Sequence, residues 1–321
     1  MKNNLPLVSV IVITYNSSKF ITETLDSIYK QSYPNIELII TDDCSSDDTI
    51  RICERWINAH RNRFYQIYLI TSNINTGIPA NCNRGYTKAN GKWIKGIAGD
   101  DCLYPDAIEK YIQYANNCDA EIYFSSMDIF QNKFVETNKI ESHISPSPIF
   151  KLNNSTPNEQ YNLLTIGNAI FAPSVFMKKE LFNKIGKYDE EITLCEDWPM
   201  WLKITQKGYK FHYIDDVLVK YRKYDESTWG KQSTVKKYVI TNKEELINAK
   251  YIYPYVDCIK RIVLKSDLYV RKRLNLLNET SSSSIILIIY KFIKLMCDKY
   301  INLMYRYYHF KHKTKYNLSQ N

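Results

Sequence analysis

The sequence lacks the patterns that mark several common classes of protein. Only nine of its 321 residues are glycine. Neither a GxGxxG fingerprint nor a glycine-rich phosphate loop follows the first apolar segment, which argues against a dehydrogenase and a nucleotidyltransferase. The eight cysteines are scattered without a CxxC pair. That spacing argues against a zinc site or a disulfide scaffold, and it favours a reducing cytoplasm.

A signal peptide and a long hydrophobic run are missing as well. Residues 1–7 are short and polar and lead directly into a strand-like segment, unlike a secretory signal. The longest apolar run, Ile285–Tyr290, is far shorter than the roughly 20 residues that span a bilayer. We therefore predict a cytoplasmic protein without a membrane-spanning helix.

The residues that are present suffice for a substantial core. Hydrophobic residues make up 45% of the chain, so extensive disorder is not expected. The length suits one α/β domain and a smaller appendage. The formal net charge of +9 is compatible with nucleotides, phospholipid headgroups or nucleic acid, and it does not choose among them.

Strand-like and helix-like segments alternate through the first 120 residues. We predict strands at 8–15, 36–41, 65–71 and 93–98. We predict helices between and after them at 20–31, 50–59, 83–89 and 105–116. This alternation is typical of a doubly wound parallel sheet.

The pattern is less regular in the second half of the chain. We predict a loop at 142–157, helices at 180–185 and 198–206, and a strand at 217–221. These elements complete a catalytic domain at 1–228. Residues 229–321 are predicted to form a helical, basic extension.

Polar residues follow three of the predicted strands, at the ends where open parallel sheets bind ligands. They are Thr14-Tyr15-Asn16, Asp42-Asp43 and Gly99-Asp100-Asp101. The carboxylate of Asp43 could accept a hydrogen bond from a uracil ring, and Tyr15 could stack on the base. For the neighbouring Asp47 and Asp48 we favour a capped turn that starts the next helix.

Two pairs of acidic residues are candidates for the chemistry itself. Asp100 and Asp101 would repel each other at a buried strand end unless a cation compensates, and their oxygens suit Mg²⁺ or Mn²⁺. Glu196 and Asp197 head an amphipathic helix, where one could act as a general base. The alternative for both pairs is an acidic helix start that favours the helix dipole.

Taken in order, these groups resemble family 2 glycosyltransferases. The segments that carry the resemblance are 8–16, Asp42-Asp43, Asn75-Thr-Gly-Ile with Asn83, Gly99–Asp101 with Tyr104-Pro-Asp106, 168–189 and Glu196-Asp197. The resemblance covers roughly residues 5–228. It implies a GT-A fold, which is a Rossmann-like, mostly parallel sheet flanked by helices, and an inverting mechanism.

The resemblance also implies roles for individual residues. The nucleotide-sugar set matches Thr14, Tyr15, Asn16, Asp43, Asn75, Asn83, Asp100 and Arg222. The metal motif matches Asp100 and Asp101, with Asp101 the direct ligand of Mn²⁺ or Mg²⁺, and the catalytic base matches Asp197 with Glu196 beside it. UDP is the expected nucleotide by analogy, although a thymidine-linked donor would fit the same contacts.

Two departures from the family pattern stand out. The acidic motif reads Asp-Asp-Cys102 with Ala98 before it, so a strict Asp-x-Asp is absent and metal dependence stays open. Tyr224 stands where relatives often have histidine. Arg222, nearby, either holds the diphosphate or is a solvated residue at a strand end.

The last segment, 285–316, interleaves apolar and aromatic residues with seven Lys and Arg, and Asp298 is its only acid. Such a helix can lie in an anionic membrane interface, or it can pack on the domain or form a dimer contact. No recognition motif supports nucleic-acid binding. By family analogy we expect a saccharide or lipid-linked acceptor in O-antigen or capsule synthesis, at the inner face of the membrane. The alternative is a nucleotide-sugar-binding scaffold without activity.

Overall fold

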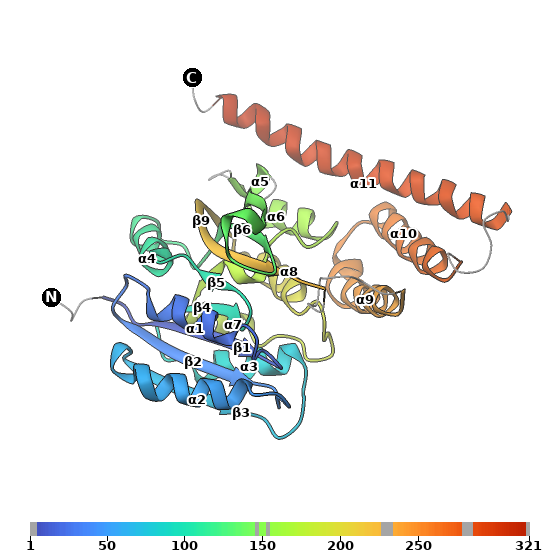
Figure 1. Cartoon of the computed structure of the whole chain (residues 1–321). Helices are drawn as coiled ribbons and strands as arrows, with labels where there is room; N and C mark the ends of the chain where they lie inside the picture. Colours follow the sequence, from blue (N-terminus) through green and yellow to red (C-terminus); the bar gives the residue numbers. More distant parts are fainter. Residues whose placement is uncertain (1–4, 145–147, 152–154, 226–233, 278–284, 319–321) are drawn as a thin grey trace.

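The computed structural model describes residues 5–144, 148–151, 155–225, 234–277 and 285–318 (Figure 1). Over these residues the chain forms one twisted sheet with helices on both faces, followed by three helices at the C-terminal end. None of the helices within the described ranges is long and apolar enough to cross a membrane. All eight cysteines are free thiols.

The first half of the sheet is parallel, as predicted. Its strands are β1 (Val8–Thr14), β2 (Ile36–Asp42), β3 (Gln66–Thr71) and β4 (Trp93–Ala98), in the spatial order β3-β2-β1-β4. In the register of the central strands, Thr14 pairs with Asp42 and Ile13 pairs with Ala98. The polar groups that follow these strands therefore meet at one edge of the sheet.

Helices cover the two faces of this half. The four are α1 (Ile21–Tyr29), α2 (Thr49–His60), α3 (Ile78–Lys88) and α4 (Ala107–Asn117). The apolar residues of α1, α2 and α4 pack in one buried cluster, and those of α3 belong to a second. Helix α3 starts earlier than predicted, because Gly77 adopts a positive φ of 87° and Pro79 occupies the first turn.

The second half of the sheet is mixed. It contains β5 (Cys102–Leu103), β6 (Ile122–Gln131), β7 (Lys139–Ile144), β8 (Val175–Lys178) and β9 (His212–Lys223). Strand β8 pairs antiparallel with β4, and the order continues β8-β6-β9-β5, with β7 on β6. The segment predicted as a loop at 142–157 is partly structured, because β7 ends and α5 (Pro148–Lys151) lies within it; residues 145–147 and 152–154 are outside the described ranges.

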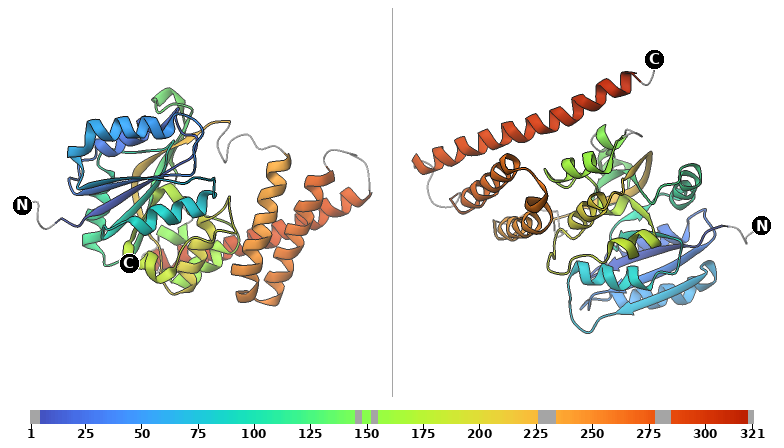
Figure 2. Two further views of the ribbon diagram at one scale, coloured as in Figure 1. Left: turned by 90° about the horizontal axis from the view of Figure 1, so that it is seen from below. Right: turned by 180° about the vertical axis from the view of Figure 1, so that it is seen from behind.

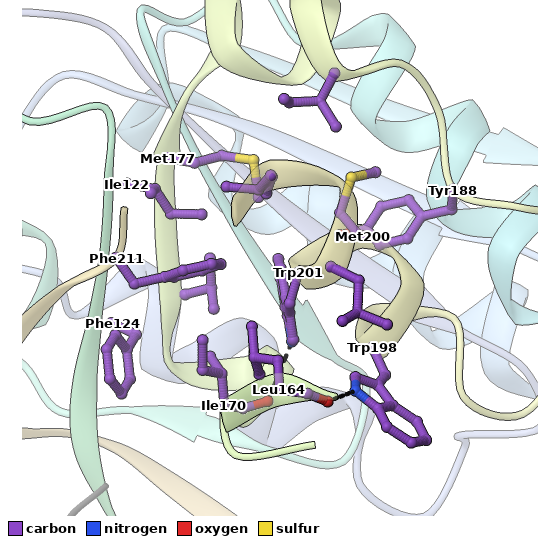
Figure 3. Close-up of a cluster of buried hydrophobic side chains, with 14 of the residues drawn as sticks. Ile122, Phe124, Leu164, Ile170, Met177, Tyr188, Trp198, Met200, Trp201 and Phe211 are labelled. Atoms are coloured by element: carbon purple, nitrogen blue, oxygen red, sulfur yellow. Dashed lines mark hydrogen bonds between the residues drawn. The ribbon is translucent and has the colours of Figure 1, made fainter. Parts of the chain in front are cut away.

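Helices α6 (Pro157–Leu164), α7 (Lys179–Ile185) and α8 (Asp197–Gln206) share a core beside this half. Figure 3 shows two tryptophans of α8 in that core. The indole of Trp198 donates to the carbonyl of Leu164 at 2.8 Å, and that of Trp201 donates to Ile170 at 3.2 Å. These bonds fix the direction of α8, which begins at the predicted base, Asp197.

The C-terminal helices are α9 (Thr234–Ile247), α10 (Cys258–Leu277) and α11 (Ile285–Leu318), gathered at one end of the molecule (Figure 2). Ile247, Ile252, Val256 and Leu264 belong to the same buried cluster as α6 and α8, so the extension is packed on the α/β part. The domain boundary predicted at 228 falls outside the described residues. Short helical turns complete the fold at Arg61–Arg63, Glu136–Asn138, Ala172–Ser174, Asn248–Ile252 and Tyr253–Tyr255.

Candidate active site

Two adjoining cavities open at the carboxyl edge of β1, β2 and β4. The outer cavity, about 480 Å³, is lined by Thr14, Tyr15, Asn16, Asp43, Asn75, Asn81, Gly99, Asp100 and Tyr224 among others. The inner cavity, about 190 Å³, is lined by residues that include Asp100, Asp101, Glu196, Asp197, Tyr188 and Tyr221. Asp100 borders both cavities, and the two acidic pairs predicted from the sequence meet around the inner one.

The segment after β1 forms one wall of the outer cavity. The Tyr15 side chain is half exposed, which leaves its ring available for stacking. Asn16 adopts a left-handed conformation with φ of 49°, and its side-chain oxygen accepts from the backbone N–H of Ser46 at 2.8 Å. Thr14 donates to Asp42 at 2.7 Å. Thr14 and Asn16 therefore tie the ends of β1 and β2 together.

Asp43 lies at the outer cavity, but its carboxylate is already engaged. It accepts from the backbone N–H groups of Thr76 and Gly77 at 2.9 and 2.7 Å, and from Arg84 at 2.6 Å. Burial alone would raise the pKa of Asp43, yet these hydrogen bonds hold it below its ordinary value. Asp43 thus positions the 75–77 turn, whose residues Asn75 and Gly77 line the cavity.

The turn expected after β2 is present, and Asp47, not the N-cap residue Asp48, makes the side-chain bond to the helix backbone. Asp48 occupies the residue before α2 and pairs with Arg51 at 2.6 Å. Asp47 accepts from the backbone N–H of Thr49 at 3.0 Å. Both residues therefore act at the helix start, as the sequence indicated.

The position of Asn83 does not support its predicted role in nucleotide-sugar binding. It is 4% exposed and does not line the outer or the inner cavity. Its amide donates to the carbonyl of Tyr188 and to Glu190, and accepts from the Tyr188 N–H at 2.9 Å. The asparagine that does line the outer cavity is Asn81, two residues earlier, which sequence reasoning missed. Its amide donates to the carbonyl of Thr14 at 3.0 Å.

Arg222 also departs from both of its predicted roles. It is 1% exposed, and its guanidinium lies between the rings of Phe20 and Phe134, at 4.2 and 3.9 Å. Nε donates to the carbonyl of Asp100 at 2.8 Å, and the backbone N–H donates to Asp101 at 2.8 Å. The side chain therefore supports the Asp100–Asp101 turn from behind, and it borders neither cavity of the site.

Tyr224 lies inside the site. Its hydroxyl donates to Oδ2 of Asp100 at 3.0 Å, and its ring packs on Phe20 with centroids 5.0 Å apart. The residue that replaces the expected histidine thus lines the outer cavity and contacts the acidic pair.

Glu196 and Asp197 line the inner cavity at the point where α8 begins. Asp197 accepts from the Asn168 side chain on one oxygen and from the Trp198 N–H on the other, each at 2.8 Å. Burial raises the pKa of Asp197. Burial and the charge of Asp197 raise the pKa of Glu196 to about 8. Asn168, which the sequence gave no separate role, is the partner that orients Asp197.

Comparison with known proteins identifies the family to which the chain belongs. The model of the family described as Glycosyl transferase family 2 matches residues 9–186, more than half of the chain. The chain belongs to glycosyl transferase family 2.

Similar proteins of other organisms are also described as glycosyltransferases. A putative teichuronic acid biosynthesis glycosyltransferase of Bacillus subtilis, TuaG, is 25% identical over 83% of this chain and 99% of its own length. An uncharacterized glycosyltransferase of Methanocaldococcus jannaschii is 28% identical over 68% of this chain and 71% of its own. The enzyme is accordingly a nucleotide-sugar-dependent glycosyltransferase, as the motifs predicted.

Solved structures agree with the GT-A fold. S. aureus TarS 1–349, in complex with UDP-GlcNAc, is similar with a TM-score of 0.56 at 18% identity over 96% of this chain and 92% of that one. The mannosyltransferase PcManGT from Pyrobaculum calidifontis, in complex with GDP-Man and Mn²⁺, gives 0.57 at 17% identity, over 96% and 88%. At these identities the likeness concerns the fold. This chain spans 44% of the longer TarS chain.

The Asp100–Asp101 pair of the glycosyltransferase fits a divalent cation. Both side chains line the inner cavity, where Asp100 accepts from the Tyr224 hydroxyl and Asp101 accepts from the Arg222 N–H. Burial raises the pKa of both carboxyl groups, and Asp100 raises that of Asp101 further. A hard cation would relieve this repulsion. The described part of the chain holds no group of three or more His, Cys, Asp or Glu that could bind a metal, so other ligands would come from substrate and water.

Proposed function

We propose that the enzyme transfers a sugar from a nucleoside diphosphate to a saccharide hydroxyl with inversion at the anomeric carbon. The observation that carries the proposal is that the two cavities adjoin and share Asp100. The outer one offers Tyr15 and the 75–77 turn for a nucleoside, Asp100 borders both cavities, and Asp101 and Asp197 line the inner one. A nucleotide sugar that lies along these cavities has its anomeric carbon between its diphosphate and the carboxylate of Asp197.

The chain's own residues then account for the displacement. Asp197 takes the proton of the acceptor hydroxyl, whose oxygen attacks the anomeric carbon from the face opposite the diphosphate. The bond between that carbon and the phosphate oxygen breaks, and its electron pair leaves with the diphosphate. A Mn²⁺ or Mg²⁺ held by Asp100 and Asp101 supplies charge neutralisation for the leaving group when bound. An α-linked donor gives a β-glycoside.

The hydrogen bonds favour Asp197 over Glu196 as the base. Asp197 accepts from Asn168 and from a helix N–H, both of which stabilise its anionic form. Burial and the charge of Asp197 outweigh a local backbone hydrogen bond to Glu196, and its pKa of about 8 keeps it protonated at neutral pH. The pair therefore carries one negative charge near pH 7, which we place on Asp197.

UDP is our proposed nucleotide. The fold neighbour TarS was solved with UDP-GlcNAc, and PcManGT with GDP-Man. A small pyrimidine suits the outer cavity of about 480 Å³, and dTDP-sugars are the competing class.

A lipid-linked acceptor at the inner membrane face completes the proposal. Helix α11 presents an apolar stripe of exposed residues: Ile288, Ile289, Phe292, Leu295, Met296, Leu303 and Tyr307. At 3.6 residues per turn they fall within about 120° of the helix surface, and exposed Lys299 and Arg306 lie among them. A basic amphipathic helix of this kind suits an anionic interface. The role in O-antigen, capsule or related polysaccharide synthesis rests on this surface and on the description of TuaG.

The donor test uses a panel of UDP-, dTDP- and GDP-sugars with the wild-type enzyme and Asp101→Asn. We expect Mn²⁺-dependent release of one nucleoside diphosphate by the wild type, and a loss of about 100-fold or more in Asp101→Asn. Calorimetric titration of each donor checks binding where turnover is slow. If no nucleotide sugar binds or turns over, the proposal fails and a scaffold role takes its place.

A further inference from the structure

A further cavity, of about 670 Å³, lies behind the turn that carries Asp100 and Asp101, and Arg222, which supports that turn, lines it. Its walls come from α1 and the residues next to its two ends, from 102–105, from the 132–135 segment between β6 and β7, and from β9. It shares no lining residue with the two cavities of the active site. We propose that this basic cavity is a second binding site, which takes a phosphate-bearing anion.

The lining of the basic cavity is strongly positive. It contains five cationic side chains, Lys19, Lys30, Lys133, Lys220 and Arg222, against two acids, Glu23 and Asp26. None of the four lysines forms an ion pair with a residue in the described part of the chain. Both acids are engaged, because Glu23 pairs with Arg222 and Asp26 accepts from the Trp56 indole at 2.8 Å. Four lysines without an acidic partner around one space attract an anion to it.

This group of lysines does not reflect a general excess of positive charge around it. Residues 1–257 contain 30 Lys and Arg against 31 Asp and Glu. Elsewhere in this part of the chain lysines do find acids: Lys110 pairs with Asp216 at 3.1 Å, and Lys178 pairs with Asp119 at 3.2 Å. The unpaired charge is therefore a local property of the basic cavity.

Aromatic rings position several of these cations without neutralising them. The guanidinium of Arg222 lies between the rings of Phe20 and Phe134, both of which line the cavity. Nζ of Lys19 lies 5.0 Å from the centroid of the Phe20 ring, and Nζ of Lys220 lies 4.7 Å from that of Tyr104. Contacts of this kind orient a cation and leave its full charge available to an anion.

The chemistry of the lining indicates the class of ligand. A phosphate group carries about 1.5–2 negative charges at neutral pH, and lysine ammonium groups bind it as point charges. The cavity, at about 670 Å³, is larger than the outer cavity of the active site at about 480 Å³. It therefore has room for an organic group beside the phosphate, against apolar Leu103 and Phe134. Such a phosphate belongs either to a soluble compound or to a lipid headgroup.

The test titrates inorganic pyrophosphate into the full-length protein in EDTA and follows binding by calorimetry. Without a metal ion, the carboxylates of Asp100 and Asp101 repel this probe, so its binding reports on the basic cavity. Dihexanoyl phosphatidylglycerol, titrated below its micelle concentration, presents phosphate on a lipid headgroup. Tighter binding of pyrophosphate assigns the site to soluble phosphate compounds, and tighter binding of the lipid assigns it to headgroups.

A double variant, Lys133→Ala/Lys220→Ala, removes two cations from the cavity. Its matched control is Lys92→Ala/Lys265→Ala. Each pair removes one exposed lysine and one lysine that lies against a tyrosine ring, and Nζ of Lys265 is 5.2 Å from the centroid of the Tyr253 ring. Circular dichroism on heating verifies that both variants are folded.

We expect the wild type to bind pyrophosphate and the cavity variant to lose about tenfold in affinity. The control should stay within about twofold of the wild type. If the cavity variant does not fold, the exposed Lys19→Ala takes its place, with an expected loss of about threefold. A wild type that binds neither probe, or equal losses in the cavity variant and the control, would overturn the proposal. Neither donor nor acceptor enters these titrations, so their outcome is independent of the proposed transferase function.

Discussion

Asp197 receives one hydrogen bond on each carboxylate oxygen, and the one from Asn168 can be removed without touching the backbone. A base acts only in its deprotonated form, so activity is lost as pH falls through its pKa. The Asn168 donor lowers that pKa against the opposing effect of burial. In Asn168→Ala we expect the acidic limb of the kcat profile to move up by about 0.5–1 pH unit.

Asn162→Ala is the matched control for this measurement. Its amide donates only within α6, to the carbonyl of Asn158 at 3.0 Å, and it leaves Asp197 untouched. The control should keep the wild-type pH profile. A profile that shifts equally in both variants, or in neither, would mean that Asn168 does not orient the base.

At the scale of elements, Arg222 links β9 to the turn that carries Asp100 and Asp101. Lysine cannot reproduce a guanidinium between two aromatic rings that also donates in several directions. We expect Arg222→Lys to lower the free energy of unfolding by about 2–4 kcal/mol, and to weaken Mn²⁺-dependent donor binding because the acidic turn loosens. Denaturant titration and calorimetry measure the two effects.

Arg63→Lys separates stability from binding. Arg63 donates to the carbonyls of Tyr29, Gln31, Tyr33 and Pro34, far along the chain from the acidic turn. The Arg63→Lys variant should lose about 1–2 kcal/mol of the free energy of unfolding and keep the donor affinity of the wild type. If Arg222→Lys behaves in the same way as Arg63→Lys, the supporting role assigned to Arg222 is wrong.

The strands β1 to β4 were predictable because strands buried in a parallel sheet are continuous apolar runs. Strand β6 was not, because its Ser125, Ser126 and Asp128 are buried polar residues. Their partners are tyrosines distant in sequence, such as Tyr111 for Ser125 and Tyr104 for Asp128. A hydropathy pattern contains no information about such partners.

The same limit applies to the site. The order of the acidic groups was enough to predict that Asp100, Asp101, Glu196 and Asp197 lie together, and these four line the inner cavity. It could not predict that Arg222 would face away from that cavity while Tyr221, its neighbour on β9, lines it. That outcome depends on which face of the strand each side chain occupies, and on the two phenylalanines that accept the guanidinium. The predicted contact of Asn83 with the nucleotide sugar is not supported for a similar reason, because helix α3 directs the Asn83 side chain towards Tyr188.

At the scale of the whole molecule, charge is strongly segregated. Residues 258–321 contain 13 Lys and Arg against three Asp and Glu, whereas residues 1–257 contain 30 against 31. On the inner face of α11, Lys294 pairs with Asp267 of α10 at 3.0 Å, and Cys297 is 6% exposed. The helix is thus docked on one side, and its apolar stripe faces outward.

We expect the enzyme to bind vesicles that contain phosphatidylglycerol, with binding that weakens as salt rises. The double variant Phe292→Glu/Leu303→Glu should lose at least about tenfold in vesicle affinity and keep its donor hydrolysis. Tyr65→Glu, which places one negative charge on a remote exposed aromatic residue, should bind as the wild type does. Sedimentation with vesicles measures all three; equal binding by the double variant would exclude α11 as the contact, and a change in oligomeric state would indicate a protein interface.

The central claim is that Asp197 is the base of an inverting transfer, and turnover by Asp197→Asn tests it most directly. The rate of nucleoside diphosphate release in the presence of Mn²⁺ and acceptor is measured beside calorimetric donor affinity. We predict a fall in kcat of about 100- to 10,000-fold with donor affinity within about twofold of the wild type. A variant that turns over at the wild-type rate, or one that loses donor binding to the same extent as turnover, would contradict the account.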